Sequence, residues 1–217
     1  MIKKREHFLN EPVFKKLSPI IFIHILFILS INILFGCSTT DNETPDHLRS
    51  ILSKHKNENH PEIITMKTLQ IEKIIFILTN KIREEHGLKT FKLDPSLSDI
   101  ARSHSIDMVN NNYFSHIDPE GKTPTDRAKD KGFKVKRFLS KTSYIEKVSE
   151  NIGKMPTGLV LYRGYVEDTP EDVAKALMKS WMIRPGHRTN ILMYFSVKIG
   201  IGVAYDGKYY LATQNFH

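Results

Sequence analysis

The chain has 217 residues, 40% of them hydrophobic and 26% charged, so it is long enough for one well-filled globular domain with an appendage. This composition excludes intrinsic disorder of the whole chain. The formal net charge is +8, of which +3 lies in residues 1–36. In the remainder, Lys and Arg are interspersed with acidic residues, which argues against nucleic-acid binding and suits an anionic lipid or wall-polymer surface. A single cysteine excludes an intrachain disulfide framework.

Residues 1–36 have the parts of an export signal. A basic stretch precedes sixteen mostly apolar residues, Ile20–Phe35, a run shorter than the roughly 20 residues that span a bilayer comfortably. Leu34–Cys37 resembles the lipobox of prokaryotic lipoproteins, in which the leader is cleaved before the cysteine and the thiol receives lipid. We therefore expect residues 1–36 to be a lipoprotein leader with Cys37 as the lipidation site, or alternatively an uncleaved membrane anchor. Both interpretations place the body outside the cytoplasmic membrane.

Residues 37–62 are polar and without apolar periodicity, which predicts a tether, and residues 63–217 are the expected domain. The domain begins with two predicted helices. The first ends at Gly87 and has apolar residues at helical spacing: Ile71, Ile74, Ile75, Leu78 and Ile82. The second begins with Asp94 as N-cap and Pro95 in its first turn, and it ends at 110–112. Its inward face comprises Leu97, Ile100, Ala101, His104 and Met108.

The rest of the chain predicts two more helices and a terminal hairpin. A short helix is expected over 125–131, and a longer one from Thr169 to the break at 184–186. Residues 133–168 show no clear pattern. Alternating apolar residues over 197–203, a turn at 206–207 and a partner strand over 209–216 predict a β-hairpin. Helices followed by an antiparallel hairpin indicate the α+β class.

Several residues have structural interpretations that compete with functional ones. His104 is expected to be a hydrogen-bonded core or cleft-edge residue rather than a ligand, and Trp181 a core residue. Gly200 and Gly202 leave one face of their strand bare, which predicts the close approach of a helix or backbone. Segment 154–168, with Tyr162 and Tyr165, is interpreted as a surface excursion rather than a binding loop.

Four short motifs carry a family resemblance. They are Tyr113–His116 (YFSH), Ser149–Gly153 (SENIG), Trp181–Leu192 (WMIRPGHRTNIL) and Ile199–Val203 (IGIGV). In this order they resemble the CAP superfamily of cysteine-rich secretory proteins, antigen 5 and pathogenesis-related proteins, specifically its short prokaryotic SCP-like branch, over about 63–217. The resemblance implies an α-β-α sandwich, with a small antiparallel sheet between helical layers.

The resemblance also implies a cleft site. Family members with a complete site present two histidines and two glutamates, and some bind a divalent metal there. By motif, His116, Glu150 and His187 match three of these positions, whereas Arg184 stands at the position of the second glutamate. A guanidinium is not a metal ligand. The three remaining residues allow a weak, open zinc site, acid–base chemistry without metal, or a purely structural role in which Glu150 accepts backbone N–H bonds. The structural role is favoured.

Two classes of function remain. The first is an envelope-tethered extracellular module with no established catalysis, whose cleft serves for binding or interaction with a lipid, a peptide or a cell-wall fragment. The alternative is a hydrolase or protease, with or without metal, that uses His116, Glu150 and His187. Ser115 and Ser149 adjoin these residues, but neither lies in the Gly-x-Ser-x-Gly elbow of a nucleophile. The sequence does not decide between an enzyme and a binding protein, and it leaves the oligomeric state open.

Overall fold

The computed structural model describes residues 46–54, 63–161 and 164–217. Residues 1–36, which are expected to be a leader or anchor, Cys37 and Tyr162 lie outside these residues, so the structure does not address the expectations for them. No helix in the described ranges combines the length and hydrophobicity needed to cross a bilayer. The described residues all belong to one unit, which extends from Pro45 to His217.

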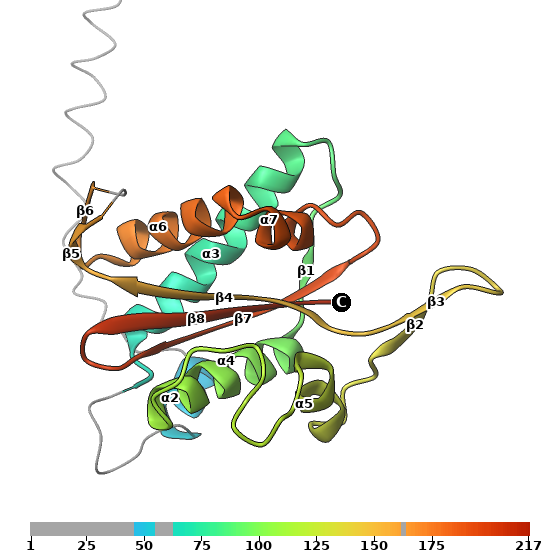
Figure 1. Cartoon of the computed structure of the whole chain (residues 1–217), viewed down its shortest axis with the longest axis horizontal. Helices are drawn as coiled ribbons and strands as arrows, with labels where there is room; N and C mark the ends of the chain where they lie inside the picture. Colours follow the sequence, from blue (N-terminus) through green and yellow to red (C-terminus); the bar gives the residue numbers. More distant parts are fainter. Residues whose placement is uncertain (1–45, 55–62, 162–163) are drawn as a thin grey trace, which may run out of the picture. The chain divides into compact units, whose positions relative to one another are not determined.

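This unit alternates helices and strands along the chain (Figure 1). The helices are α2 (Asp46–Lys54), α3 (Met66–Glu85), α4 (Pro95–Asn110), α5 (Pro124–Asp130), α6 (Pro170–Ile183) and α7 (Pro185–Ile191). The strands are β1 (Lys92–Leu93), β2 (Lys136–Phe138), β3 (Tyr144–Glu146), β4 (Ser149–Pro156), β5 (Gly158–Val160), β6 (Gly164–Val166), β7 (Lys198–Tyr205) and β8 (Tyr209–Phe216).

The central sheet has the order β1-β7-β8-β4. Strand β8 pairs antiparallel with both β7 and β4, as the predicted hairpin requires. The two-residue strand β1 pairs parallel with β7, so the sheet is mixed rather than purely antiparallel. Helices α3, α6 and α7 cover one face of the sheet and α4 and α5 the other (Figure 1). The predicted α+β sandwich is confirmed.

Successive side chains of β7 point to opposite faces of the sheet, and each face is covered by a different helical layer. Its odd-numbered residues Ile199, Ile201 and Val203 are buried in one hydrophobic cluster with side chains of α3 and α6, including Ile75 and Trp181. Trp181 is fully buried and donates its indole N–H to the carbonyl of Ile152 at 2.9 Å, which confirms its expected place in the core. The period of two along the strand therefore decides which helical layer each side chain meets.

The helix starts follow the predicted capping. Asp94 accepts a hydrogen bond from the backbone N–H of Leu97 at 3.1 Å, and Thr169 accepts one from Asp172 at 3.2 Å. Residues 184–186, expected only to break a helix, do end α6, but Pro185 then occupies the first turn of α7. Proline suits that position because its missing N–H would be unpaired there anyway.

Helix α2 lies inside the range expected to be a polar tether. Its Ile51 and Leu52 pack against a small cluster that contains Ile63, Ile64 and Leu69. Two apolar side chains on one face of a nine-residue helix are a weak periodic signal in the sequence, and this packing contributes to holding the helix on the domain.

Two glycines of β7 set the distance between the sheet and α4. A β-carbon on Gly200 would lie 2.1 Å from the backbone carbon of Leu97, and one on Gly202 would lie 2.0 Å from the backbone nitrogen of Arg102. No β-carbon fits at these distances, because the atoms it would meet are backbone rather than flexible side chain. The predicted close approach is confirmed.

We expect Gly202→Ala to lower the free energy of unfolding by about 3 kcal/mol or more, because α4 must move away from the sheet. Urea denaturation measures this loss. Gly186→Ala is the matched control, because no atom lies within 4 Å of its added methyl group. The control should be neutral or slightly stabilising, since alanine is the better helix former. Equal midpoints for Gly202→Ala and the control would contradict the steric explanation.

Candidate functional site

Strand β4 places two adjacent polar residues on opposite faces of the sheet. Glu150 pairs in register with Asn215, and Asn151 pairs with Gln214. Glu150 points to the layer of α4 and α5, whereas the side chain of Asn151 donates to the carbonyl of His187 in α7 at 3.1 Å. The matched motif Ser149–Gly153 is therefore a buried strand that connects both helical layers.

The carboxylate of Glu150 is 1% exposed and is bound by two side chains. Arg127 donates from its guanidinium to Oε2 at 2.6 Å, and His116 lies with Nδ1 2.9 Å from Oε1. The expectation that Glu150 accepts backbone N–H bonds is wrong, because the donors found here are side chains of other segments. A buried carboxylate requires such charged and hydrogen-bonded compensation.

Arg127 is the site residue that the sequence analysis missed. Besides Glu150, its guanidinium donates to the carbonyls of His116 and Lys122, at 2.9 and 3.0 Å. An arginine in a seven-residue helix resembles a solvent-exposed cation when only the sequence is known. The neighbouring Ala128 is fully buried in the structure, but one alanine in a seven-residue helix gives no usable signal in the sequence.

His116 and His187 lie near each other at the surface beside Glu150. The imidazole of His116 is 45% exposed, and its centroid is 6.3 Å from that of His187. Because a carboxylate oxygen accepts, Nδ1 of His116 is the protonated nitrogen, which leaves Nε2 as an acceptor in the neutral ring. Burial, with the nearby positive charges of Arg184 and His116, lowers the pKa of His187. The three predicted site residues are thus brought together.

His104 lies behind Glu150 as a buried histidine. Its Nε2 donates to the carbonyl of Ser115 at 3.1 Å and lies 3.8 Å from the Glu150 carboxylate. The hydroxyl of Tyr113, which donates to Asp107, lies 3.3 Å from Nδ1. Burial lowers the pKa of His104, so the ring is kept neutral. The expectation of a hydrogen-bonded core histidine is confirmed.

The described residues do not fit the zinc site that the resemblance allows. Within these residues, no group of three His, Cys, Asp or Glu side chains could hold a metal ion. Both oxygens of Glu150 are engaged, one by Arg127 and one by His116. Only the two imidazoles then remain, and a catalytic zinc ion requires three protein ligands. Arg184 is exposed at the junction of α6 and α7 and supplies no ligand.

A cavity of about 460 Å³ adjoins the site on the side of α4 and α5. His104 and Arg127 form part of its wall, whereas His116, Glu150 and His187 are outside its lining. The lining carries charges of both signs: Asp107, Asp118, Glu120, Lys122, Arg127, Asp130 and Lys131. We expected a cleft lined by His116, Glu150 and His187. The cavity lies next to these residues instead, and Arg127 lines it.

The chain folds as an α-β-α sandwich in which Glu150 of the central sheet pairs with His116 of the loop after α4. The chain belongs to the cysteine-rich secretory protein (CAP) family, whose model matches residues 76–216.

Three bacterial proteins are similar to this chain. It is 36% identical over 145 residues to the uncharacterized protein YkwD and 32% identical over 145 residues to the uncharacterized membrane protein YlbC, both of Bacillus subtilis. Each match covers 67% of this chain, and 46% and 34% of the two relatives. The crystal structure of an extracellular SCP-domain protein from Bacillus anthracis matches at 29% identity and a TM-score of 0.50, over 82% of this chain and 44% of that one. The matched region thus spans less than half of each relative.

A crystal structure of NaASP2 with Zn²⁺ also matches, over 73% of this chain and 83% of that one. Its identity of 12% and TM-score of 0.42 are too low for any conclusion about individual residues here.

We expect Arg127→Met to lower the free energy of unfolding by about 3–5 kcal/mol, because it leaves the Glu150 carboxylate buried without its cation. The double variant Arg127→Met with Glu150→Gln should recover much of that loss, since it removes the charge together with its partner. Urea denaturation of the full cycle measures the coupling. Lys122→Met, which removes two neighbouring exposed ion pairs, is the control and should leave the midpoint nearly unchanged. Strictly additive losses would show that the two residues do not act as a pair.

Proposed function

We propose that this protein works outside the cytoplasmic membrane as an envelope-tethered binding module, and that its cavity takes a polar cell-wall fragment, a sugar unit that carries a short peptide. The observation that carries the proposal is the mixed-charge cavity beside the Glu150–Arg127 pair. The extracellular SCP-domain relative and the membrane relative support a location at the cell envelope.

The lining chemistry supports a peptide-bearing wall fragment over a lipid. The cavity is lined by both acidic and basic side chains, and Lys122 pairs with Glu120 and Asp130 at 2.9 Å. An acyl chain would leave these charges without water, which is costly. A ligand with amide, hydroxyl, ammonium and carboxylate groups can replace the lost water with hydrogen bonds of its own.

The geometry supports binding more strongly than hydrolysis. A general base needs a free acceptor within reach of substrate, yet both oxygens of Glu150 are engaged within the protein. The hydroxyl of Ser115 accepts from the backbone N–H of Ile117 and is not hydrogen-bonded to a histidine. Nε2 of His116 is not engaged by Glu150, whereas Nδ1 of His187 is buried without a hydrogen-bond partner among the described residues. The 45% exposed imidazole of His116 therefore suits a hydrogen bond to a ligand.

Filling the cavity tests the binding proposal. Ser103 lines it from the exposed side of α4, so Ser103→Trp should weaken binding of soluble peptidoglycan fragments at least about tenfold. Isothermal titration of the purified full chain measures the affinity. Ser96→Trp, in the same helix but outside the lining, is the control and should bind as the wild type does. The proposal fails if the wild type binds no fragment or if both variants bind equally. Release of cleaved products by the wild type would instead favour the hydrolase.

The membrane attachment rests on Cys37, the single cysteine of the chain. We propose that its thiol is acylated after cleavage of residues 1–36. In cells supplied with an alkyne-bearing fatty acid, the wild type should be labelled and Cys37→Ser should not. Ser38→Ala, at the neighbouring position, should be labelled normally. Equal labelling of wild type and Cys37→Ser would contradict acylation at this residue and leave the uncleaved anchor.

A further inference from the structure

The hairpin formed by β2 and β3 extends beyond the end of the central sheet, away from the helical layers (Figure 1). Its strands pair with Phe138 opposite Tyr144 and Lys136 opposite Glu146. One face of the hairpin is attached to the domain through Arg137, whose guanidinium donates to the carbonyl of Phe195. The other face lies in solvent, so it contributes little to the core.

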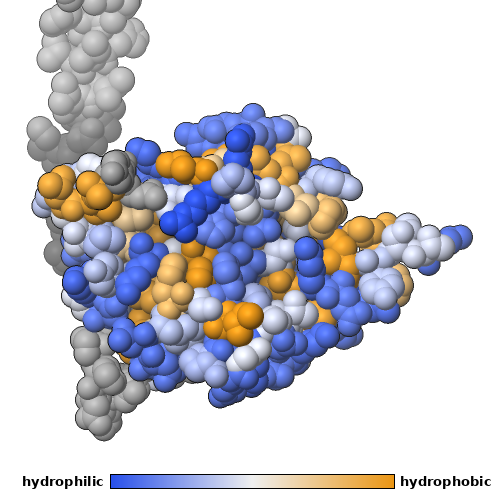
Figure 2. All heavy atoms as spheres, in the orientation of Figure 1, coloured by the Kyte–Doolittle hydropathy of each residue, from blue (hydrophilic) through white to orange (hydrophobic). Residues whose placement is uncertain are grey.

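Aromatic side chains are concentrated on that free face. Phe138 is 64% exposed and Tyr144 53%, and their ring centroids are 6.0 Å apart. Leu139, which follows directly, is 47% exposed. Large apolar side chains that cluster in water mark a contact surface more often than single ones do. Figure 2 shows hydrophobic and hydrophilic residues side by side on this projection.

The same hairpin has a strong excess of positive charge. Five of the residues from 134 to 147 are basic, namely Lys134, Lys136, Arg137, Lys141 and Lys147, and Glu146 is the one acidic residue. The ammonium of Lys136 lies 4.0 Å from the ring centroid of Tyr144, so charge and aromatic surface belong to one face. Glu146 lies 3.6 Å from Lys129 of α5 and is partly neutralised.

We propose that this hairpin docks on an anionic lipid bilayer. Lysines near an anionic membrane are attracted to its surface, and aromatic rings prefer the headgroup level. The projection is convex, which suits a planar partner better than a small ligand. A soluble wall polyanion would pair with the lysines but leave Phe138 and Tyr144 in water. The proposal is independent of the cavity's ligand.

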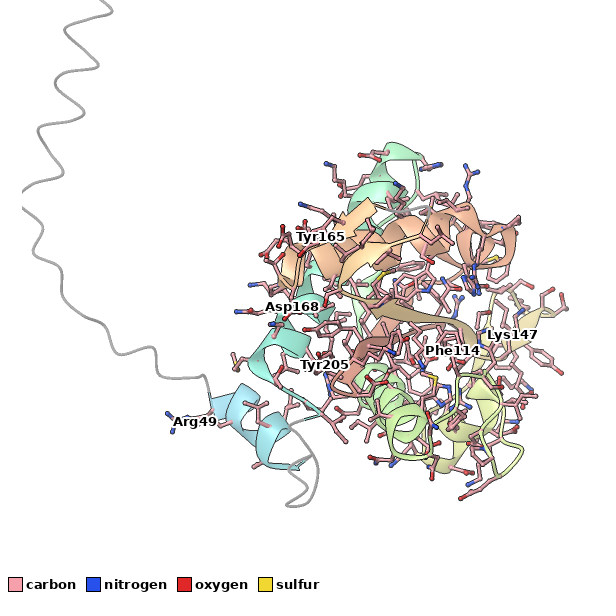
Figure 3. All side chains as sticks on the ribbon, turned by 60° about the vertical axis from the view of Figure 1, so that its left-hand side comes forward. Arg49, Phe114, Lys147, Tyr165, Asp168 and Tyr205 are labelled. Atoms are coloured by element: carbon pink, nitrogen blue, oxygen red, sulfur yellow. The ribbon has the colours of Figure 1, made fainter. Side chains whose placement is uncertain are left out.

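A second exposed hairpin provides a control within the same molecule. Strands β5 and β6 expose Leu159 (85%) and Tyr165 (68%), so this hairpin is at least as apolar. It is followed by the acidic residues Glu167 and Asp168 and has no cluster of lysines. The two hairpins lie at opposite ends of the domain (Figures 1 and 3). Comparing the two hairpins therefore shows whether exposed apolar side chains are sufficient for membrane contact or whether positive charge beside aromatic rings is also needed.

The test is a lysine footprint of the full chain in lipid nanodiscs. Acetylation rates are measured by mass spectrometry in discs of phosphatidylcholine alone and in discs with added phosphatidylglycerol. Lys136 and Lys141 should react at least about threefold more slowly in the anionic discs, and high salt should reduce this protection. Lys175 and Lys179, exposed on α6, are internal references and should react equally in both discs. Because both discs hold the same chain, its N-terminal attachment does not affect the comparison.

Paired variants identify the responsible side chains. Phe138→Ser with Tyr144→Ser should abolish most of the protection, whereas Leu159→Ser with Tyr165→Ser should preserve it. All four side chains are exposed, so both variants should fold, and thermal melting is the check. Equal rates in the two kinds of disc would overturn the proposal. Equal protection by a soluble polyanion such as heparin, without lipid, would also overturn it, because the surface would then recognise charge alone.

Discussion

The negative charge of Glu150 is buried in the sheet, and the segments around it are organised by the need to compensate that charge. Arg127 reaches it from α5, and the same guanidinium holds the carbonyls of His116 and Lys122. One ion pair thereby fixes the loop that runs from α4 to α5. Since that loop and α5 form a wall of the cavity, the shape of the cavity depends on the carboxylate although Glu150 does not line it.

Strand β4 joins the two layers through side chains that follow each other in sequence. Glu150 binds groups on the α4 and α5 side, and Asn151 binds the carbonyl of His187 and the amide of Asn190 on the α7 side. Asn190 returns a hydrogen bond to the backbone carbonyl of Glu150 at 3.1 Å. His116 and the half-buried His187 therefore reach the same place from different helical layers. The two histidines are close to each other because adjacent residues of β4 bind them, Glu150 at the His116 ring and Asn151 at the His187 carbonyl.

The sequence predicted those parts of the fold whose periodicity or capping is local. Asp94 and Thr169 begin helices as expected, and the bare face of Gly200 and Gly202 corresponds to close packing of α4. Strand β4 was not predicted, because Glu150 and Asn151 interrupt the apolar pattern of a strand that is nonetheless buried. Polar residues in a sequence do not indicate a buried strand unless the residues that bind them are known, here Arg127 for Glu150 and His187 for Asn151.

The candidate site was predicted in part for the same reason. The motifs brought His116, Glu150 and His187 to attention, and the structure places them together. Arg127 has no motif of its own, and its role depends on a carboxylate 23 residues away in sequence. The sequence also could not show whether the three residues bind a metal. The answer depends on which side chains already donate hydrogen bonds to the Glu150 carboxylate.

The place of β8 in the sheet has a consequence for the order of folding. Residues 209–216 lie between β7 and β4, so the strand at 149–156 has no partner in the sheet until the later segment is available. Contacts between segments this far apart in sequence form slowly. A chain that crosses a membrane in extended form would therefore remain without its central sheet until residues 209–216 have emerged. Late closure of the sheet is compatible with the location outside the membrane that we propose for this protein.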